Sequence, residues 1–280
     1  FSVLPTRIGG VDDIELVTRA GRRMAEVGGR MVEVVVLRTG EASAALMKRY
    51  PRSRVVALDF ALPMLQQARR RGRLMRRPVT LCADLEQLPL ASGSVDMIYS
   101  NAAIQWCTDL EATFRDFLRV LRPGGLLMFS TFGPDTLKEL RQAWSAVDDR
   151  PHVSPFMDMH DIGDMLMRSQ FAEPVMDAEF INMTYEDVRD LMRDIKAIGA
   201  HNAMQERHRG LTGKSRMQHF MQAYEQFRTQ GRLPSTWEVI YGHAWAPEQL
   251  REEGGVTRVA VESISRKGPP PADDSAAGSS

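Results

Sequence analysis

Two apolar runs end in a single acid: Arg54-Val-Val-Ala-Leu-Asp59 and Val79-Thr-Leu-Cys-Ala-Asp84. Two further runs, Val95-Asp-Met-Ile-Tyr-Ser100 and Leu126-Leu-Met-Phe-Ser-Thr131, are similarly short and apolar. Runs of this kind, bounded by turn or helix signals, are typical of parallel strands that are covered on both faces. In open α/β sheets, ligands bind beyond the carboxyl ends of the strands, which is where the two acids fall. The pattern predicts a nucleoside-binding sheet.

Helical segments alternate with these strands. The sequence predicts helices over 41–50, 63–71 and 110–121, and the last of them ends at Arg122-Pro-Gly-Gly125. A strand over 32–37 precedes the first of these helices, and a further helix is expected over 11–31. The alternation across 32–131 favours an α/β fold with a doubly wound, Rossmann-like sheet.

Beyond Gly133 the sequence becomes helical, with only two short runs, 237–243 and 256–261, that look like strands. Helices are expected over 136–147, 159–167, 185–199 and 215–230. We therefore expect five parts: an N-terminal helical segment (1–31), a cofactor-binding sheet core (32–133), a helical cap for the substrate (134–235), C-terminal strands that complete the sheet (236–265) and a disordered tail (266–280).

Composition limits the possible partners. Lys and Arg total 36 against 36 Asp and Glu, so the net charge implies no global attraction to nucleic acid or to a membrane. Cys82 and Cys107 lie on or beside predicted buried elements, which suits small core residues in a reducing cytoplasm. The sequence contains no run of eighteen apolar residues and no secretory signal pattern, so we expect a soluble chain.

Three groups of residues are candidates for chemistry. Asp59 can accept hydrogen bonds from both ribose hydroxyls; the alternative is a helix cap for the segment that begins near Pro63. Asp84 can accept from an adenine amino group while the backbone N–H of Leu85 donates to a ring nitrogen; the alternative is again capping. After the fourth strand, amide donors and a flat ring could wall a reaction centre, although the Trp is as readily explained by core packing. These wall residues are Asn101, Gln105 and Trp106.

Several of these runs resemble the class I S-adenosylmethionine-dependent methyltransferases. They are Leu58-Asp-Phe-Ala-Leu-Pro-Met-Leu65, Ala83-Asp-Leu-Glu-Gln-Leu-Pro-Leu90, Asn101-Ala-Ala-Ile-Gln-Trp-Cys107 and Leu121-Arg-Pro-Gly-Gly-Leu126. The resemblance implies a methyltransferase sheet with a helical cap insertion and S-adenosylmethionine as the cofactor. The expected cofactor contacts are Gly40, Asp59, Asp84, Leu85 and Asn101.

Within that superfamily, later segments are similar to the malonyl-acyl-carrier-protein O-methyltransferases of biotin synthesis. They are Phe132-Gly-Pro-Asp-Thr-Leu-Lys-Glu-Leu-Arg141, Asp149-Arg-Pro-His-Val-Ser-Pro-Phe156, Gly199-Ala-His-Asn-Ala-Met204 and Leu211-Thr-Gly-Lys-Ser-Arg216. This resemblance implies methyl transfer to the free carboxylate of a malonyl thioester on acyl carrier protein. The sulfonium leaving group is already activated, so the reaction needs no metal, and the carboxylate is ionised at neutral pH, so the reaction needs no general base. We expect a cytoplasmic monomer that binds neither nucleic acid nor membrane.

Two sets of cations follow from that reaction, each with a solvated surface as the alternative. A buried malonyl carboxylate should meet a cation, and the candidates in the cap are Arg150, His152, Arg207, Lys214 and Arg216. A local basic cluster could dock an acidic carrier protein, and its members are Arg69, Arg70, Arg71, Arg73, Arg76 and Arg77.

The first strand departs from the family pattern of an acid followed by a glycine-rich turn. Here the matching stretch is Glu33-Val-Val-Val-Leu-Arg-Thr-Gly40, which keeps only the last glycine. Side chains at Val36 and Arg38 would occupy space that glycines leave for the cofactor. The departure suggests that residues 1–39 are altered. Taken at face value, the departure gives one alternative, an inactive scaffold. A second alternative is an S-adenosylmethionine-dependent protein-modifying assembly factor of the complex I arginine hydroxylase type, because that protein has a similar cap.

Overall fold

The structure is a computed structural model that describes residues 33–37, 41–71, 77–197 and 213–248. The helix predicted over 11–31, the strand predicted over 256–261 and the tail lie outside the described residues. Everything below concerns the described part of the chain.

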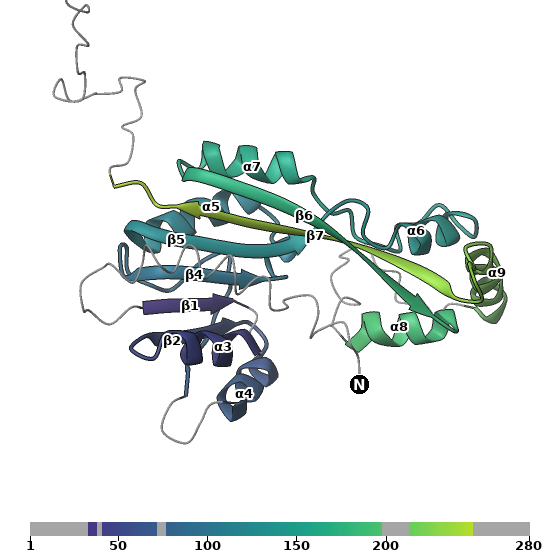
Figure 1. Cartoon of the computed structure of the whole chain (residues 1–280), viewed down its shortest axis with the longest axis horizontal. Helices are drawn as coiled ribbons and strands as arrows, with labels where there is room; N and C mark the ends of the chain where they lie inside the picture. Colours follow the sequence, from purple (N-terminus) through teal and green to yellow (C-terminus); the bar gives the residue numbers. More distant parts are fainter. Residues whose placement is uncertain (1–32, 38–40, 72–76, 198–212, 249–280) are drawn as a thin grey trace, which may run out of the picture. The chain divides into compact units, whose positions relative to one another are not determined.

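Seven strands form one sheet in the order β3-β2-β1-β4-β5-β7-β6. The bounds are β1 Glu33–Leu37, β2 Arg54–Asp59, β3 Val79–Cys82, β4 Val95–Asn101, β5 Leu121–Phe132, β6 Ala172–Tyr185 and β7 Leu233–Trp245. The first five strands are parallel to one another, whereas β7 is antiparallel to both β5 and β6 (Figure 1). The predicted doubly wound α/β sheet is confirmed.

Helices connect these strands. Their bounds are α3 Glu41–Arg49, α4 Leu62–Arg71, the short 3-10 helix η1 Ile104–Trp106, α5 Leu110–Val120, α6 Lys138–Ser145, α7 Met159–Arg168, α8 Val188–Ala197 and α9 Lys214–Glu225. Asp109 caps α5, because its side chain accepts a hydrogen bond from the Ala112 N–H at 2.8 Å.

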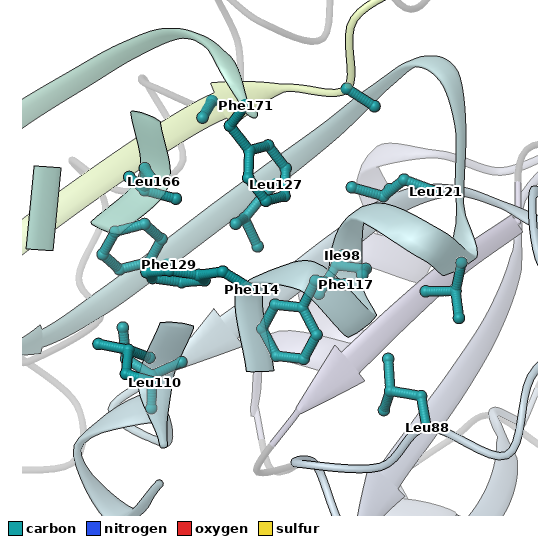
Figure 2. Close-up of a cluster of buried hydrophobic side chains, with 14 of the residues drawn as sticks. Leu88, Ile98, Leu110, Phe114, Phe117, Leu121, Leu127, Phe129, Leu166 and Phe171 are labelled. Atoms are coloured by element: carbon teal, nitrogen blue, oxygen red, sulfur yellow. The ribbon is translucent and has the colours of Figure 1, made fainter. Parts of the chain in front are cut away.

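The main core lies on one face of the sheet, where α5 and α7 pack against β4, β5 and β7. Phe114 and Phe117 of α5 are fully buried there, and Leu166 of α7 packs in the same cluster (Figure 2). Phe114 contacts Phe129 of β5 with ring centroids 5.9 Å apart. This apolar stripe fixes the strands whose carboxyl ends form the candidate site.

The opposite face carries a smaller core in which Leu46 of α3 packs with Met97, Tyr99 and Met128. Side chains alternate between the two faces along a strand, so Ile98 belongs to the main core while its neighbours face α3. Both faces of β4 are therefore covered, as expected for a central parallel strand.

A third apolar cluster joins the carboxyl ends of the sheet to the cap. It contains Ala102 and Phe132, which follow β4 and end β5, together with Trp144 of α6, Phe220 of α9 and Trp237 of β7. Its remaining buried members come from α6, α8, α9, β6 and β7 and from the loops that adjoin α6. The helices of the cap thus pack beside the edge of the sheet at which ligands bind in this fold class.

Three sequence expectations need correction. Residues 172–185, which were assigned to the helical cap, form the fourteen-residue strand β6 at the edge of the sheet, so the sheet is completed by β6 and β7. β3 is an edge strand, and Val79 is 45% exposed rather than covered on both faces. Cys82 on that strand is also exposed, so it is not a core residue.

The helices of the described residues are all too short or too polar to cross a lipid bilayer.

Candidate functional site

Asp59 is the last residue of β2 and is buried, with 9% of its surface exposed. Its Oδ1 accepts a hydrogen bond from the Ala61 N–H at 2.8 Å, just before α4 begins at Leu62. The capping contact and a ligand-binding role are compatible, because a carboxylate has two oxygens and several acceptor positions.

Asp84 lies at the same edge of the sheet as Asp59. Cys82 is the register partner of Asp59 on the neighbouring strand, and the Ala83 N–H donates to the carbonyl of Asp59 at 3.3 Å. The Asp84 side chain is exposed, and its Oδ1 accepts from the Glu86 N–H at 2.9 Å. The two acids predicted from the sequence are therefore brought to the carboxyl ends of adjacent strands. Leu85, which follows, packs its side chain against the main core.

Phe60 was missed by the sequence analysis. Its ring is 77% exposed, although it directly follows the buried Asp59. An exposed aromatic ring at the ligand-binding edge offers a flat surface for a nucleobase. The available signal was the position of an aromatic residue immediately after a strand-ending acid.

Glu86 was also missed, and it holds two loops of the site together. Its Oε1 accepts from the Thr108 N–H at 2.9 Å, and its Oε2 accepts from the Asp109 N–H at 3.3 Å. The loop that carries Asp84 is thereby fixed to the segment that follows η1. No local sequence pattern indicates this pairing.

Asn101 ends β4 opposite Ser130 of β5. The Ser130 hydroxyl donates to Asn101 Oδ1 at 2.7 Å. Directly afterwards, Ala102 adopts a left-handed backbone with φ 45°, which turns the chain away from the strand. Non-glycine residues held in this region are strained, and such strain gathers at functional sites.

Gln105 and Trp106 lie in η1, beyond Asn101. The Gln105 Nε2 donates to the Ala102 carbonyl at 2.7 Å, and its Oε1 accepts from the Thr131 hydroxyl at 3.4 Å. The amide of Gln105 is thus engaged in holding the loop. Trp106 is half-buried. Their predicted role as a wall of the reaction centre stays a prediction.

A hollow opens on the sheet face next to Asn101. Its lining includes Tyr99, Met128 and Ser130 of β4 and β5 and His243 of β7. Ser130 links this hollow to Asn101 through its hydroxyl. Burial lowers the pKa of His243, which favours the neutral imidazole at neutral pH.

Two of the predicted substrate cations, His152 and Arg216, are both bound to Asp148 in the cap. The His152 Nε2 lies 2.7 Å from Asp148 Oδ1, and Arg216 forms an ion pair with Asp148 Oδ2. Arg150 has an exposed side chain, and its backbone N–H also reaches Asp148, at 3.1 Å. Arg207 and the side chain of Lys214 lie outside the described residues, as does Gly40.

The predicted carrier-docking cluster lies at a different edge of the sheet. Exposed Arg69 and Arg70 occupy the last turn of α4, and exposed Arg77 precedes β3. Since α4 runs from the carboxyl end of β2 back to the start of β3, these side chains lie toward the amino ends of the strands. The side chain of Arg71, as well as Arg73 and Arg76, lies outside the described residues.

The sequence is similar to those of known methyltransferases. A model of the methyltransferase domain matches residues 36–129. A malonyl-acyl-carrier-protein O-methyltransferase from Gallionella capsiferriformans is 53% identical over 215 residues, covering 75% of this chain and 74% of that protein. The chain belongs to this methyltransferase family. The family member from Laribacter hongkongensis is 50% identical over 242 residues, covering 84% and 79%. The family member from Legionella pneumophila is 37% identical over 271 residues, covering 91% and 94%.

Solved structures support the fold. A candidate methyltransferase from Bacillus halodurans superposes with a TM-score of 0.55 at 18% identity, covering 82% of this chain and 99% of that chain. The YcgJ protein of Bacillus subtilis gives 0.56 at 14% identity, covering 83% and 99%. The sheet and its helices are therefore a methyltransferase fold.

The cofactor of this methyltransferase is S-adenosylmethionine, and the residues at the carboxyl edge fit its adenosine part. Ribose hydroxyls and an adenine amino group are donors, which match the two carboxylates of Asp59 and Asp84. The exposed ring of Phe60 lies beside the buried acid. Among the described residues, no group of His, Cys, Asp and Glu side chains could hold a metal ion.

Proposed function

We propose that this chain transfers a methyl group from S-adenosylmethionine to the free carboxylate of a malonyl thioester on acyl carrier protein, an early step of biotin (pimeloyl) synthesis. The main support for this proposal is the length of chain over which the similarity to these enzymes extends. The methyltransferase domain model ends at residue 129, whereas 50% identity to the Laribacter hongkongensis malonyl-acyl-carrier-protein O-methyltransferase extends over 242 residues. The resemblance therefore includes the cap, which is the part of a methyltransferase that selects the acceptor.

The residues at the carboxyl edge hold the cofactor. In the proposed arrangement, Asp59 accepts from the ribose hydroxyls, Asp84 accepts from the adenine amino group, and Phe60 stacks on the base. The backbone N–H of Leu85 donates to a ring nitrogen. When bound, S-adenosylmethionine supplies an activated methyl group on a sulfonium.

The protein must align the acceptor and exclude water. A malonyl carboxylate titrates near pH ~4 and is ionised at neutral pH, so no side chain has to remove a proton. Holding the two reactants in line can lower the barrier by about 7 to 11 kcal/mol. We therefore assign Asn101, Gln105 and Trp106 to the wall of the reaction centre.

In this proposal the substrate region is formed by the cap helices α6, α8 and α9, because residues 172–185 of the predicted cap (134–235) belong to the sheet as β6. Phe132 at the end of β5 contacts Phe156 and Trp237, with ring centroids 5.7 Å and 5.5 Å apart. This aromatic cluster lies at the carboxyl end of β5, where it can keep water from the acceptor.

In this proposal the basic residues at the end of α4 do not bind the carrier protein at the entrance to the site. Arg70 lies in the last turn of α4, eight residues after Leu62, and the helical rise places it about 12 Å along the helix from Leu62, which lies at the edge that carries Asp59. We propose that Arg69, Arg70 and Arg77 attract an acidic carrier over distance rather than deliver its thioester. The variant Arg70→Glu should slow association at low salt, and an unchanged rate would contradict this role.

Two further parts of the proposal concern the setting. We place the enzyme in the cytoplasm and as a monomer. Support for a reducing compartment comes from Cys82 and Cys107, neither of which forms a disulfide. Light scattering of the purified chain tests the monomer.

Mass spectrometry tests the proposed function. Malonyl carrier protein is incubated with the enzyme and with S-adenosylmethionine that carries a labelled methyl group. The proposal expects one labelled methyl ester on the malonyl group and none on acetyl carrier protein, which lacks the free carboxylate. Methyl labelling of another protein instead of the malonyl group, or no labelling at all, would contradict it.

A further inference from the structure

The buried hydroxyl of Ser130 is bound to Asn101, a residue predicted to wall the reaction centre. Ser130 is 3% exposed and pairs with Asn101 across β5 and β4. Its Oγ lies 2.7 Å from Asn101 Oδ1 and 3.2 Å from the Ala102 backbone nitrogen. Asn101 itself is half-buried at the carboxyl end of the central strand β4.

The hydrogen-bond donors and acceptors around Ser130 determine which end of the Asn101 amide lies next to its hydroxyl. The Ala102 N–H donates toward Ser130, reaching both its carbonyl at 2.9 Å and its hydroxyl at 3.2 Å. The single hydroxyl proton of Ser130 therefore goes to Asn101 Oδ1. If the amide were reversed, that buried proton would have no acceptor among the described residues, and buried polar groups are almost always paired. The two N–H groups of Asn101 consequently point away from Ser130.

The backbone at this place supports a fixed orientation. Ala102 is held at φ 45° immediately after Asn101, and the same N–H that is bound to Ser130 secures this strained residue. Ser130 therefore holds both the Asn101 side chain and the backbone of Ala102.

We propose that Asn101 donates a hydrogen bond from Nδ2 to the substrate carboxylate, and that Ser130 is the positioning residue that orients this donor. The inference rests on the proposed function, and it names the group that meets the acceptor. Two cap cations that were expected to do so, His152 and Arg216, are both bound to Asp148.

A neutral donor suits the reaction better than a cation. During transfer, a carboxylate oxygen forms a bond to the methyl carbon, the carbon–sulfur bond breaks with its electron pair on sulfur, and no proton moves. The carboxylate charge disappears as the ester forms. A cation would therefore stabilise the acceptor more before the transfer than during it, which raises the barrier. An amide N–H orients one oxygen with a weaker hold on the charge.

The test compares two serines on the same pair of strands. Ser130→Ala removes the proton that turns Asn101, whereas Ser100→Ala removes a fully buried hydroxyl that has no hydrogen-bond partner among the described residues. We expect Ser130→Ala to lower kcat roughly tenfold, as the loss of one oriented hydrogen bond would. Ser100→Ala should leave kcat unchanged, and Ser130→Thr, which keeps the hydroxyl, should retain most of it.

A double-mutant cycle separates positioning from a merely structural role. Ser130→Ala should have no further effect in an Asn101→Ala background, because the donor that it orients is already missing. A second readout is the binding of a malonyl thioester in the presence of S-adenosylhomocysteine. That binding should weaken in Ser130→Ala while the affinity for S-adenosylhomocysteine stays the same. Asn101→Asp keeps the acceptor for Ser130 and should fold, yet it should repel the thioester carboxylate.

The outcomes distinguish this inference from the proposed function. Methyl transfer by the unaltered enzyme, with additive effects of Ser130→Ala and Asn101→Ala, overturns the inference alone. Equal effects of Ser130→Ala and Ser100→Ala do the same. No methyl transfer by the unaltered enzyme overturns the proposed function; thioester binding that is equal in the enzyme and in Ser130→Ala then overturns the inference as well.

Discussion

His152 lies flat against Trp144, with ring centroids 3.9 Å apart and 11° between the ring planes. Phe220 of α9 stacks on the other face of Trp144, with ring centroids 4.3 Å apart. Asp148 joins the same assembly through His152 and Arg216. The loop after α6 and the first turn of α9 are therefore locked together by stacked rings and one shared carboxylate.

Replacing the Asp148 carboxylate should destabilise the packing of the cap. Burial, the strongest influence, would raise the pKa of Asp148, but the hydrogen bonds from His152 and the Arg150 N–H, with the charges of His152 and Arg216, hold it below its ordinary value. The variant Asp148→Asn should lower the free energy of unfolding at pH 7 by roughly 1 to 3 kcal/mol. Chemical denaturation measures this change.

The stabilisation that the Asp148 carboxylate gives to the fold should depend on pH. Because the pKa of Asp148 is lower in the folded state, its stabilisation is complete above the pH near ~4 at which the unfolded carboxyl titrates, and it is lost as the pH falls further. Asp148→Asn should flatten this acid-side loss, whereas Asp149→Asn, at the exposed neighbouring acid, should not. An acid limb that is the same in all three proteins would contradict the cap lock.

Two glycines should respond in opposite directions to alanine. A Cβ at Gly242 of β7 would meet the ring of Phe129 and, at 2.8 Å, the sulfur of Met176. Gly242→Ala should therefore destabilise the fold by about 1 to 3 kcal/mol through overpacking. At Gly163 in α7 the nearest atom is Met176 Cγ at 3.8 Å, so Gly163→Ala should stabilise by roughly 0.5 to 1 kcal/mol. Thermal melts of both variants check the pair, and a lower melting temperature for Gly163→Ala would count against this packing.

The two cysteines should differ in reactivity. Cys82 is exposed, whereas burial raises the pKa of Cys107 to about 12. At neutral pH, Cys107 then carries on the order of a thousandfold less thiolate than an ordinary thiol. We expect iodoacetamide to label Cys82 first and Cys107 only after unfolding, as followed by peptide mass spectrometry. Prompt labelling of Cys107 in a Cys82→Ser variant would show that its environment is wrongly described.

The central strands β2 and β4 were predictable because they are short, apolar and mostly buried. β2 was predicted with its exact bounds, and Asp59 and Asp84 fall where the rule for open α/β sheets places ligands. β6 was missed for a physical reason. It is an edge strand with exposed acids such as Glu173, Asp177 and Glu179, and it contains Pro174, which weakens a strand prediction.

Contacts between distant segments could not be predicted from the sequence. The bond between Ser130 and Asn101 depends on the register of β4 and β5, which local patterns do not give. Likewise, Arg216 was expected to be available for substrate, but an acid 68 residues earlier in the chain is its partner. The sequence shows that a residue such as Arg216 is a cation, but it does not show which acidic residue will be its partner.

The most direct test of the account is the titration of the chain with S-adenosylhomocysteine by calorimetry, beside the variant Asp59→Asn. Hydrogen bonds to a charged group contribute about 1.5 to 3 kcal/mol, so the variant should bind roughly ten to a hundredfold more weakly. The account predicts binding of one molecule per chain and this loss in the variant. Equal affinity of the two proteins would contradict the placement of the cofactor at the end of β2.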